Sequence, residues 1–439
     1  KKIFPDDFDD ILFQVNDTVY LKKYEQDSTL LELTATEGYK DSLLRSQSAK
    51  KLLIESSKIL YGDTLSSDRF KFDLNFKLND NDFKYKFNFV DNGLPHRINI
   101  LIGKNGVGKS QSIKKIADYL IAPTLLEKEE GFHISDHPSF ISNLIVFAYN
   151  PYEDFRVPKD DANLSIIYKY NGFRRYINSQ LMFDINTPLD VAFKSFVDIY
   201  KKDRNNFAHK IKLYDESLIN RLISLIASAV QKFKYIGLKF KSDSSILRYK
   251  KDFTIIEHDY FDNYLLIEEI DIEAEALPEI DFSDFEEKIY FVSTESRLLS
   301  MSSGQTIFCS LVLNLLSVIK NNSLILIDEP ETALHPNLEI DFIKLLKNIL
   351  IEFDSFAIIA THSAIITREV PSPFVKVIKL DEEDKPVISP PVINTFGADI
   401  GTITNYVFDD IFIQEKPHDN WISEQKDKYD SFDIFENEF

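Results

Sequence analysis

The sequence predicts an α/β fold, with a mostly parallel sheet flanked by helices, a smaller antiparallel β unit and a helical insert. Three observations support this prediction. Apolar strand-like runs alternate with helical periodicities between residues 286 and 405. A glycine-rich loop joins a strand to a helix near residue 105, which is the usual α/β phosphate-binding unit. Two runs of alternating aromatic and polar residues flank a polar turn at 79–82, which is typical of a β-hairpin.

Composition excludes several classes of protein. Of 439 residues, 44% are hydrophobic and 28% charged, which is ordinary for a soluble folded chain and argues against wholesale disorder. The longest uncharged run, 298–319, is too polar for a membrane span. The single Cys309 excludes an intrachain disulfide and a thiolate zinc cluster, and fits a cytoplasmic location. The chain opens without Met, so a removed targeting segment stays an open alternative.

The elements follow from periodicity, taken in chain order. We expect an N-terminal helix within 40–60, hairpin strands at 70–78 and 83–89, a strand at 98–102 followed by a helix to 120, and a strand at 141–149. Residues 190–233 are predicted to be mostly helical. The remaining strands are expected at 289–292, 324–327, 356–360 and 375–380, and the remaining helices at 306–319 and 338–351.

These elements divide the chain into five predicted parts. They are an N-terminal helical extension (1–60), a first lobe with the phosphate loop (61–154), a mostly helical insert (155–285), a second lobe (286–405) and an acidic aromatic C-terminal tail (406–439).

Charge is distributed in blocks, although the net charge of -20 opposes nonspecific nucleic-acid binding by the whole surface. Residues 190–251 carry 14 bases against 6 acids, whereas 252–287 carry 14 acids and neither Lys nor Arg. The segment 409–439 has 10 acids, 3 bases and interspersed aromatic residues. Two interpretations remain open: solvated faces, or a polyanion-facing basic insert and a tail that docks a partner.

The glycine-rich loop has the phosphate-loop pattern of Gly, four residues, Gly, Lys, Ser. Its glycines let backbone N–H groups surround phosphate, Lys109 meets the β- and γ-phosphates, and the Ser110 hydroxyl reaches magnesium. The predicted nucleotide-binding residues here are Gly103, Lys104, Asn105, Gly106, Val107, Gly108, Lys109, Ser110 and Gln111.

Two carboxylates end the apolar strand 324–327. Asp328 is suited to hold magnesium and Glu329 to polarise the attacking water. Because ligands bind at the carboxyl ends of parallel strands, we expect both beside the phosphate loop. The alternative is a glycine turn and an unrelated acidic strand end.

Two further motifs resemble those of ABC-type ATPases. The segment 299–305 (Leu-Ser-Met-Ser-Ser-Gly-Gln) is similar to the signature motif, with serine in place of its first glycine. The resemblance implies that Ser302, Ser303, Gly304 and Gln305 of one molecule hold the γ-phosphate bound to a second. The segment 360–363 (Ala-Thr-His-Ser) resembles the switch region, which makes His362 a γ-phosphate contact; a structural histidine is the alternative.

The segment 328–336 is typical of the RecF, OLD and SMC-like branch of that class. The resemblance places His335 in a loop that touches the partner subunit, with a plain helix cap as the alternative. The class usually has a glutamine loop after the strand that ends near Tyr149, and here Asn150 follows. Asn150 either replaces it as a magnesium or water contact, or that role is absent.

The resemblance implies an ABC-ATPase head that uses ATP and Mg2+ and forms a head-to-tail dimer. Long coiled-coil arms and a nuclease domain of the OLD kind are not expected, and 381–384 (Asp-Glu-Glu-Asp) is interpreted as a hairpin turn. The segment 394–403 also resembles PtuA-type ATPases of Septu and retron antiphage systems, which implies a separate PtuB-like HNH nuclease as partner and nucleic acid bound directly or through it. The alternatives are a RecF-like ATPase that clamps DNA in repair and a nucleotide-gated assembly scaffold.

Overall fold

The computed structural model describes residues 71–78, 81–91, 93–126, 131–135, 141, 143–158, 166–208, 217–258, 262–271, 276–332 and 334–408, together with Glu32, Thr36 and Gly38. The predicted helix within 40–60 and the acidic segment 409–439 lie outside these residues. Within them, no helix is both long and apolar enough to cross a membrane.

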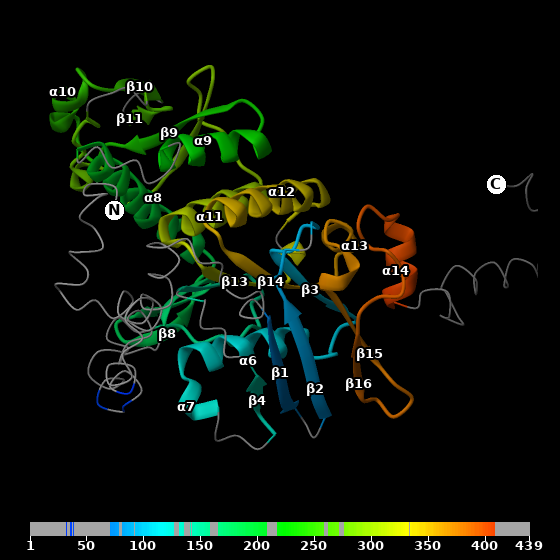
Figure 1. Cartoon of the computed structure of the whole chain (residues 1–439). Coiled ribbons are helices and arrows are strands. Elements are labelled where there is room, and N and C mark those ends of the chain that lie inside the picture. Colours follow the sequence, from blue (N-terminus) through cyan, green and yellow to red (C-terminus); the bar gives the residue numbers. More distant parts are fainter. Residues whose placement is uncertain are drawn as a thin grey trace, which may run out of the picture.

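A seven-stranded sheet forms the centre of the molecule (Figure 1). Its strands, in spatial order, are β16 (Pro386–Ser389), β15 (Val375–Leu380), β3 (Ile98–Gly103), β14 (Phe356–Thr361), β13 (Ser323–Asp328), β5 (Asn143–Ala148) and β6 (Ile167–Gly172). Neighbours are parallel except for the hairpin β15–β16, whose turn is the predicted 381–384 segment. The α/β prediction is therefore confirmed.

The register of the central strands aligns the ends that carry the motifs. Asp328 of β13 lies opposite Ala360 of β14, and Thr361 of β14 lies opposite Ile102 of β3. Residues of these strands alternate between two hydrophobic cores, one on each face of the sheet. A strand buried on both faces needs a nearly continuous apolar run, which is why 324–327 and 356–360 could be recognised in the sequence.

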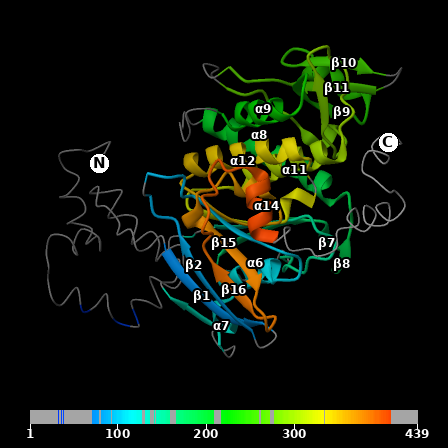
Figure 2. The same ribbon diagram turned by 90° about the vertical axis from the view of Figure 1, so that its right-hand side faces the viewer.

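Helices and a small sheet cover the two faces (Figures 1 and 2). One face packs against α6 (Lys109–Ile121) and the hairpin β1 (Lys71–Leu78) and β2 (Asn81–Asn88), which pairs with β4 (His133–Ser135) in an antiparallel sheet. The other face packs against α8 (Thr187–Ala208), α9 (Leu218–Ala229), α11 (Ser303–Val318) and α12 (Pro336–Glu352). Short helices α7 (Pro123–Leu126) and α13 (Ala364–Thr367) and the final α14 (Ile400–Phe408) complete the lobes.

The sequence predicts that the insert 155–285 is mostly helical. This prediction is wrong, because the described residues of the insert form strands as well as helices. Helices α8 and α9 form as expected, yet six described strands lie between β5 and β12. They are β6 of the central sheet, the hairpin β7 (Arg174–Ile177) and β8 (Gln180–Phe183), and β9 (Phe233–Lys239), β10 (Thr254–His258) and β11 (Asp262–Ile267). The last three join β12 (Tyr290–Ser293) in a four-stranded antiparallel sheet, beside the short helix α10 (Ile246–Tyr249). Its strands are rich in Ile, Tyr, Phe and Leu, and their acidic neighbours hide the pattern.

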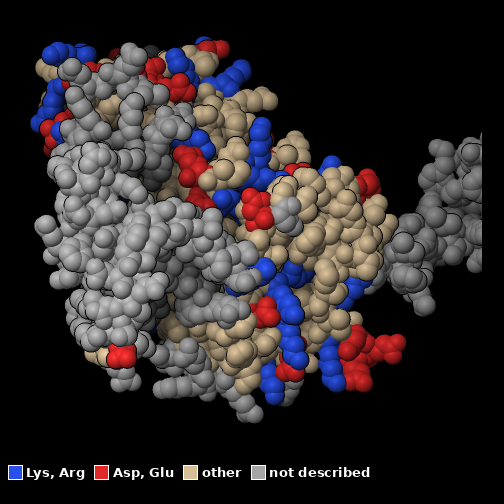
Figure 3. All heavy atoms as spheres, viewed as in Figure 1, with Lys and Arg blue, Asp and Glu red and all other residues tan. Residues whose placement is uncertain are grey.

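The basic and acidic blocks of the insert pair with each other. Lys239 lies 3.0 Å from Asp262 and 3.3 Å from Glu286. The other pairs across the blocks are Lys234–Glu268, Arg204–Glu279, Arg248–Asp281 and Arg248–Asp284. On the face in Figure 3, Lys and Arg side chains are interspersed with Asp and Glu side chains. Four of the fourteen bases of the basic block are thus paired with residues of the acidic block.

Candidate nucleotide-binding site

The phosphate loop lies between β3 and α6, as predicted, and its conformation requires glycine at two positions. Gly106 and Gly108 have φ of 79° and 92°, in the left-handed region that favours glycine. A Cβ on Gly108 would lie 2.8 Å from ring carbons of Phe83, because the tip of the hairpin β1–β2 packs against the loop. Lys104, Asn105 and Gly106 are exposed, Val107 is buried, and Ser110 and Gln111 are half-buried at the start of α6.

Lys109 is the buried cation of the site. Its side chain is 4% exposed, and its Nζ donates to the backbone oxygens of Gly103 and Lys104, both at 3.1 Å. Nζ also lies 2.7 Å from Nε2 of His362. Burial lowers the pKa of Lys109 to about 8, although the carboxylates of Glu329, Glu331 and Asp328 act in the opposite direction. The ammonium is thus held inside the loop, where nucleotide phosphates would lie.

Asp328 ends β13 with a buried carboxyl group that is incompletely satisfied. The residue is 2% exposed, and its Oδ1 has no hydrogen-bond partner among the described residues. Burial raises the pKa of Asp328 to about 7, and a hydrogen bond with Ser110 opposes this rise. An orphaned carboxylate oxygen beside a hydroxyl fits Mg2+, which prefers hard oxygen ligands. No cluster of three or more His, Cys, Asp or Glu residues that could hold a metal occurs in the described ranges.

Glu329 follows immediately and contacts two predicted site residues. Its Oε1 lies 3.1 Å from Nε2 of His362, and its Oε2 accepts a hydrogen bond of 3.3 Å from Nδ2 of Asn150. The hydrogen bond with His362 lowers the pKa of Glu329 against the effect of burial. Glu329 has a φ of 47°, a conformation that non-glycine residues rarely adopt and that is common at active sites. The carboxylate is therefore ionised and fixed in direction.

His362 joins the cationic and anionic parts of the site. Its Nε2 is within hydrogen-bond distance of both Lys109 and Glu329, but one ring nitrogen cannot accept from the first and donate to the second at the same time. The tautomer therefore decides which contact forms. The backbone N–H of His362 donates to Glu331, and its ring stacks on Phe408 with centroids 6.4 Å apart.

Sequence reasoning assigned no role to Glu331 or Phe408. Burial raises the pKa of Glu331, whose Oε2 has no partner among the described residues. Glu331 was visible in the 328–336 motif, two positions after Glu329. Phe408 gave no signal, because only the fold brings the end of α14 to the end of β14.

The signature segment is not part of this cluster in the same chain. Ser302 begins α11 as its N-cap: Ser302 Oγ accepts from the backbone N–H of Gln305, whose side chain accepts from the backbone N–H of Ser302. Ser302 and Ser303 are exposed, Gly304 and Gln305 are half-buried, and none of the hydrogen bonds resolved among the described residues links these four to the phosphate loop. His335, the N-cap position of α12, is exposed and makes no side-chain cap hydrogen bond.

Comparisons with known proteins add the following. Residues 165–368 match the family described as "AAA domain, putative AbiEii toxin, Type IV TA system", a range that includes Asp328, Glu329 and His362 but not the phosphate loop. Protein ea59 of Escherichia phage lambda is 26% identical over 384 residues. That match covers 84% of this chain, which spans 65% of the length of ea59.

Solved structures with similarity include the SMC head domain from Thermotoga maritima, with a TM-score of 0.34, 14% identity, and coverage of 74% of this chain and 98% of that one. UvrA2 from Deinococcus radiodurans has a TM-score of 0.33, 12% identity, and coverage of 81% and 42%. Residues 165–368 are therefore similar to an AAA-family ATPase domain, and the phosphate loop and the carboxylates at the end of β13 have the pattern of a nucleotide-binding site.

Proposed function

We propose that the chain binds ATP with Mg2+ in this cluster and hydrolyses it to ADP and phosphate. The observation that carries the proposal is the convergence of Lys109, Asp328, Glu329 and His362 within hydrogen-bond distance of one another or of the loop. In this scheme Lys109 neutralises the β- and γ-phosphates, Ser110 and Asp328 hold Mg2+, and Glu329 polarises the attacking water. Magnesium, when bound, supplies charge neutralisation at the phosphate oxygens.

Nζ of Lys109 and Nε2 of His362 lie 2.7 Å apart, close enough for both side chains to contact one γ-phosphate. A γ-phosphate near both side chains replaces this 2.7 Å contact with two contacts to phosphate oxygens. His362 then reports the presence of the γ-phosphate, and Asn150, at 3.3 Å from Glu329, orients the base or the water. In this proposal Asn150 replaces the glutamine that the class usually has after this strand.

We further propose that ATP closes a head-to-tail dimer. Ser302 and Ser303 are exposed at the N-terminus of α11, where backbone N–H groups suit contact with the phosphates of ATP held by a second molecule. ATP then favours the closed dimer, and hydrolysis releases it. His335, exposed and without a cap bond, is a candidate contact across this interface.

The closed dimer is proposed to control a separate PtuB-like HNH nuclease in antiphage defence. The 381–384 segment forms the turn between β15 and β16. The family match is named for a toxin–antitoxin system and ea59 belongs to a phage, which supports a role in conflict between bacteria and phages. The segment 409–439 remains the candidate docking tail.

The rival proposal is a RecF-like clamp that binds DNA itself. The pairing of Lys234, Lys239, Arg204 and Arg248 with acidic residues reduces the positive charge that these four residues could offer to DNA phosphates. Lys202 donates to the backbone oxygen of Ser317, so its role is structural as well. These contacts favour a nucleic-acid role through the partner, and leave an assembly scaffold as the third possibility.

A pull-down separates these functions. Tagged Glu329→Gln protein is recovered from its native cells, and bound proteins and nucleic acids are identified. A small HNH nuclease that is lost on deletion of 409–439 supports the defence proposal. Replication or repair proteins with DNA contradict it and support the clamp.

A further inference from the structure

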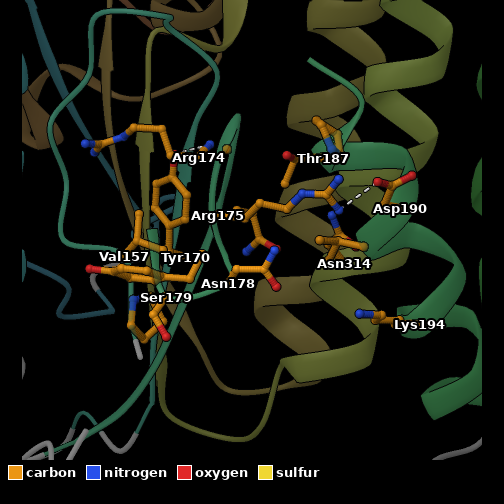
Figure 4. A pocket seen from close by; sticks show the side chains of 16 residues that line it. Val157, Tyr170, Arg174, Arg175, Asn178, Ser179, Thr187, Asp190, Lys194 and Asn314 are labelled. Atoms are coloured by element: carbon orange, nitrogen blue, oxygen red, sulfur yellow. Dashed lines mark hydrogen bonds and ion pairs between the residues drawn. The ribbon is translucent and has the colours of Figure 1, made fainter. Parts of the chain in front are cut away.

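A cavity of about 560 Å3 lies apart from the ATP cluster, between the strands β6 and β7, the first turns of α8, and α11 (Figure 4). Its volume is within the range of small-ligand pockets. Most of the residues that line it are polar, among them Tyr170, Arg174, Arg175, Thr187, Lys194 and Asn314.

Three cations and one carboxylate, Asp190, line the cavity, and one of the cations, Arg174, is paired with Glu153. Arg175 extends across it (Figure 4), with its guanidinium 2.7 Å from Asp190 and 2.5 Å from Asp184, and its buried Nε has no partner among the described residues. Lys194, from the second turn of α8, points its amine toward the same space and is exposed. An anion that enters the cavity would therefore meet an ammonium and an unsatisfied guanidinium N–H.

Neutral groups that suit a nucleotide surround these cations. Asn178 and Ser179 form the turn of the hairpin β7–β8, with φ of 49° and 65°, and face the cavity from one side. Thr187 and Asn314 face it from the helices. Amides and hydroxyls can hydrogen-bond the edges of a base or sugar, and the Tyr170 ring offers a flat surface for stacking.

The cavity wall is joined to the ATP site by a short series of contacts. Arg174 donates two hydrogen bonds, of 2.7 and 2.8 Å, to the carboxylate of Glu153, and Tyr170 donates a third. The Glu153 side chain is 2% exposed, so these contacts are made in the interior. The backbone N–H of Glu153 donates to the backbone oxygen of Asn150, whose Nδ2 contacts Glu329.

We propose that this cavity binds the phosphate group of a nucleotide, either free or at the 5′ end of a nucleic-acid strand, and that Arg174, Glu153 and Asn150 transmit its occupancy to Glu329. Binding stands independently of the proposed function, whereas transmission rests on it. A ligand that contacts Arg174 or Tyr170 changes the hydrogen bonds of these residues to Glu153. Because the backbone of Glu153 is bonded to that of Asn150, this change moves Asn150 relative to Glu329, the proposed base.

The binding test uses the full chain with Lys109→Ala, so that the phosphate loop does not contribute. The probe is a ten-nucleotide DNA strand with a 3′ fluorescein and a 5′ phosphate, followed by anisotropy, with AMP, GMP, CMP and UMP as competitors. Lys194→Glu should weaken binding roughly tenfold or more, because hydrogen bonds to charged groups are strong. Lys344→Glu, an equal charge change at an exposed position of α12 outside the cavity, should leave it unchanged.

The outcomes separate the two sources of phosphate. Loss of affinity with a 5′ hydroxyl and no competition by mononucleotides identifies a strand end, whereas displacement by a mononucleotide identifies a free nucleotide. Absence of binding by every probe, or equal weakening by Lys194→Glu and Lys344→Glu, overturns the proposed site.

Transmission is tested with an intact phosphate loop. Saturating probe should change the ATP hydrolysis rate of the wild-type chain, and Glu153→Gln should abolish that response while probe affinity is retained. A hydrolysis rate that the bound probe does not alter overturns the transmission. A chain that binds the probe but hydrolyses no ATP overturns the proposed function and leaves the binding site supported.

Discussion

Replacement of Asp328 by Asn should stabilise the nucleotide-free protein while it weakens magnesium-dependent ATP binding. The Asp328 carboxyl is buried at the end of β13 with an unpartnered oxygen, and burial raises its pKa from 3.8 to about 7. Its ionisation is thus harder in the folded protein than in the unfolded chain. An amide of the same shape removes that charge from the interior.

The magnitude follows from linkage. A pKa rise of about three, at about 1.4 kcal/mol for each pH unit, corresponds to about 4 kcal/mol. This pKa already includes the attraction between Asp328 and Lys109, but the amide keeps a buried polar group without a partner, so we expect a net gain of about 2 to 4 kcal/mol. For the roughly 300 residues that the structure describes, this corresponds to a rise in Tm of about 3 to 6 °C.

The sign of the pH dependence provides the sharper test. A carboxyl group whose pKa is raised on folding does not destabilise the folded state at a pH below its unfolded-state pKa. The destabilisation grows as the pH rises and becomes constant once the pH exceeds the folded-state pKa. The advantage of Asp328→Asn should therefore be small near pH 4, grow between pH 4 and 7, and stay constant above pH 7.

The assay is thermal unfolding of both proteins in EDTA across this pH range, repeated with Mg2+ and ATP. The added ligand should raise the Tm of the wild type much more than that of the variant. A variant that is less stable than the wild type at pH 8, or whose advantage is independent of pH, would refute the reasoning.

Three further predictions concern the same site. Lys109→Ala should abolish tight ATP binding, measured with a fluorescent ATP analogue; affinity within threefold of the wild type would contradict the assignment. Gly108→Ala should weaken ATP binding at least tenfold, because its Cβ meets Phe83, whereas Gly93→Ala, with a positive φ and open space, should cost only about 1–2 kcal/mol of stability and leave binding intact. The kcat/KM for ATP should fall below about pH 7, where Asp328 gains a proton, and above about pH 8, where Lys109 loses one; a flat profile from pH 6 to 9 would show that neither ionisation matters.

Much of the nucleotide cluster could be predicted from the sequence because its signals are local. The spacing of Gly103, Gly108 and Lys109 specifies a loop that only one backbone path satisfies, and an apolar run that ends in two acids specifies the end of a buried strand. Parallel pairing of β13 with β14 then places the ends of these strands side by side, as the register of Asp328 with Ala360 shows.

The remaining features depend on contacts between distant segments. The four-stranded sheet of β9, β10, β11 and β12 is not predicted from the sequence. Its short aromatic strands lie in a segment with many charged residues, which obscure the alternation of apolar and polar positions. The pairing of Lys239 with Asp262 and Glu286 joins blocks that the sequence presents as separate surfaces. The stacking of His362 on Phe408 and the ion pair between Glu153 and Arg174 likewise need the fold, since neither pair has a spacing rule.

The most direct test of the central claim is the behaviour of Glu329→Gln with Mg2+ and ATP. ATP turnover and molar mass in solution are measured together, with Glu382→Gln, in the exposed turn between β15 and β16, as the matched control. The account predicts that Glu329→Gln retains ATP, that its turnover falls at least roughly hundredfold, and that its mass doubles from 50.9 kDa, while the control behaves like the wild type. Normal turnover by Glu329→Gln would contradict the assignment of the base, and a monomer saturated with ATP would contradict the dimer.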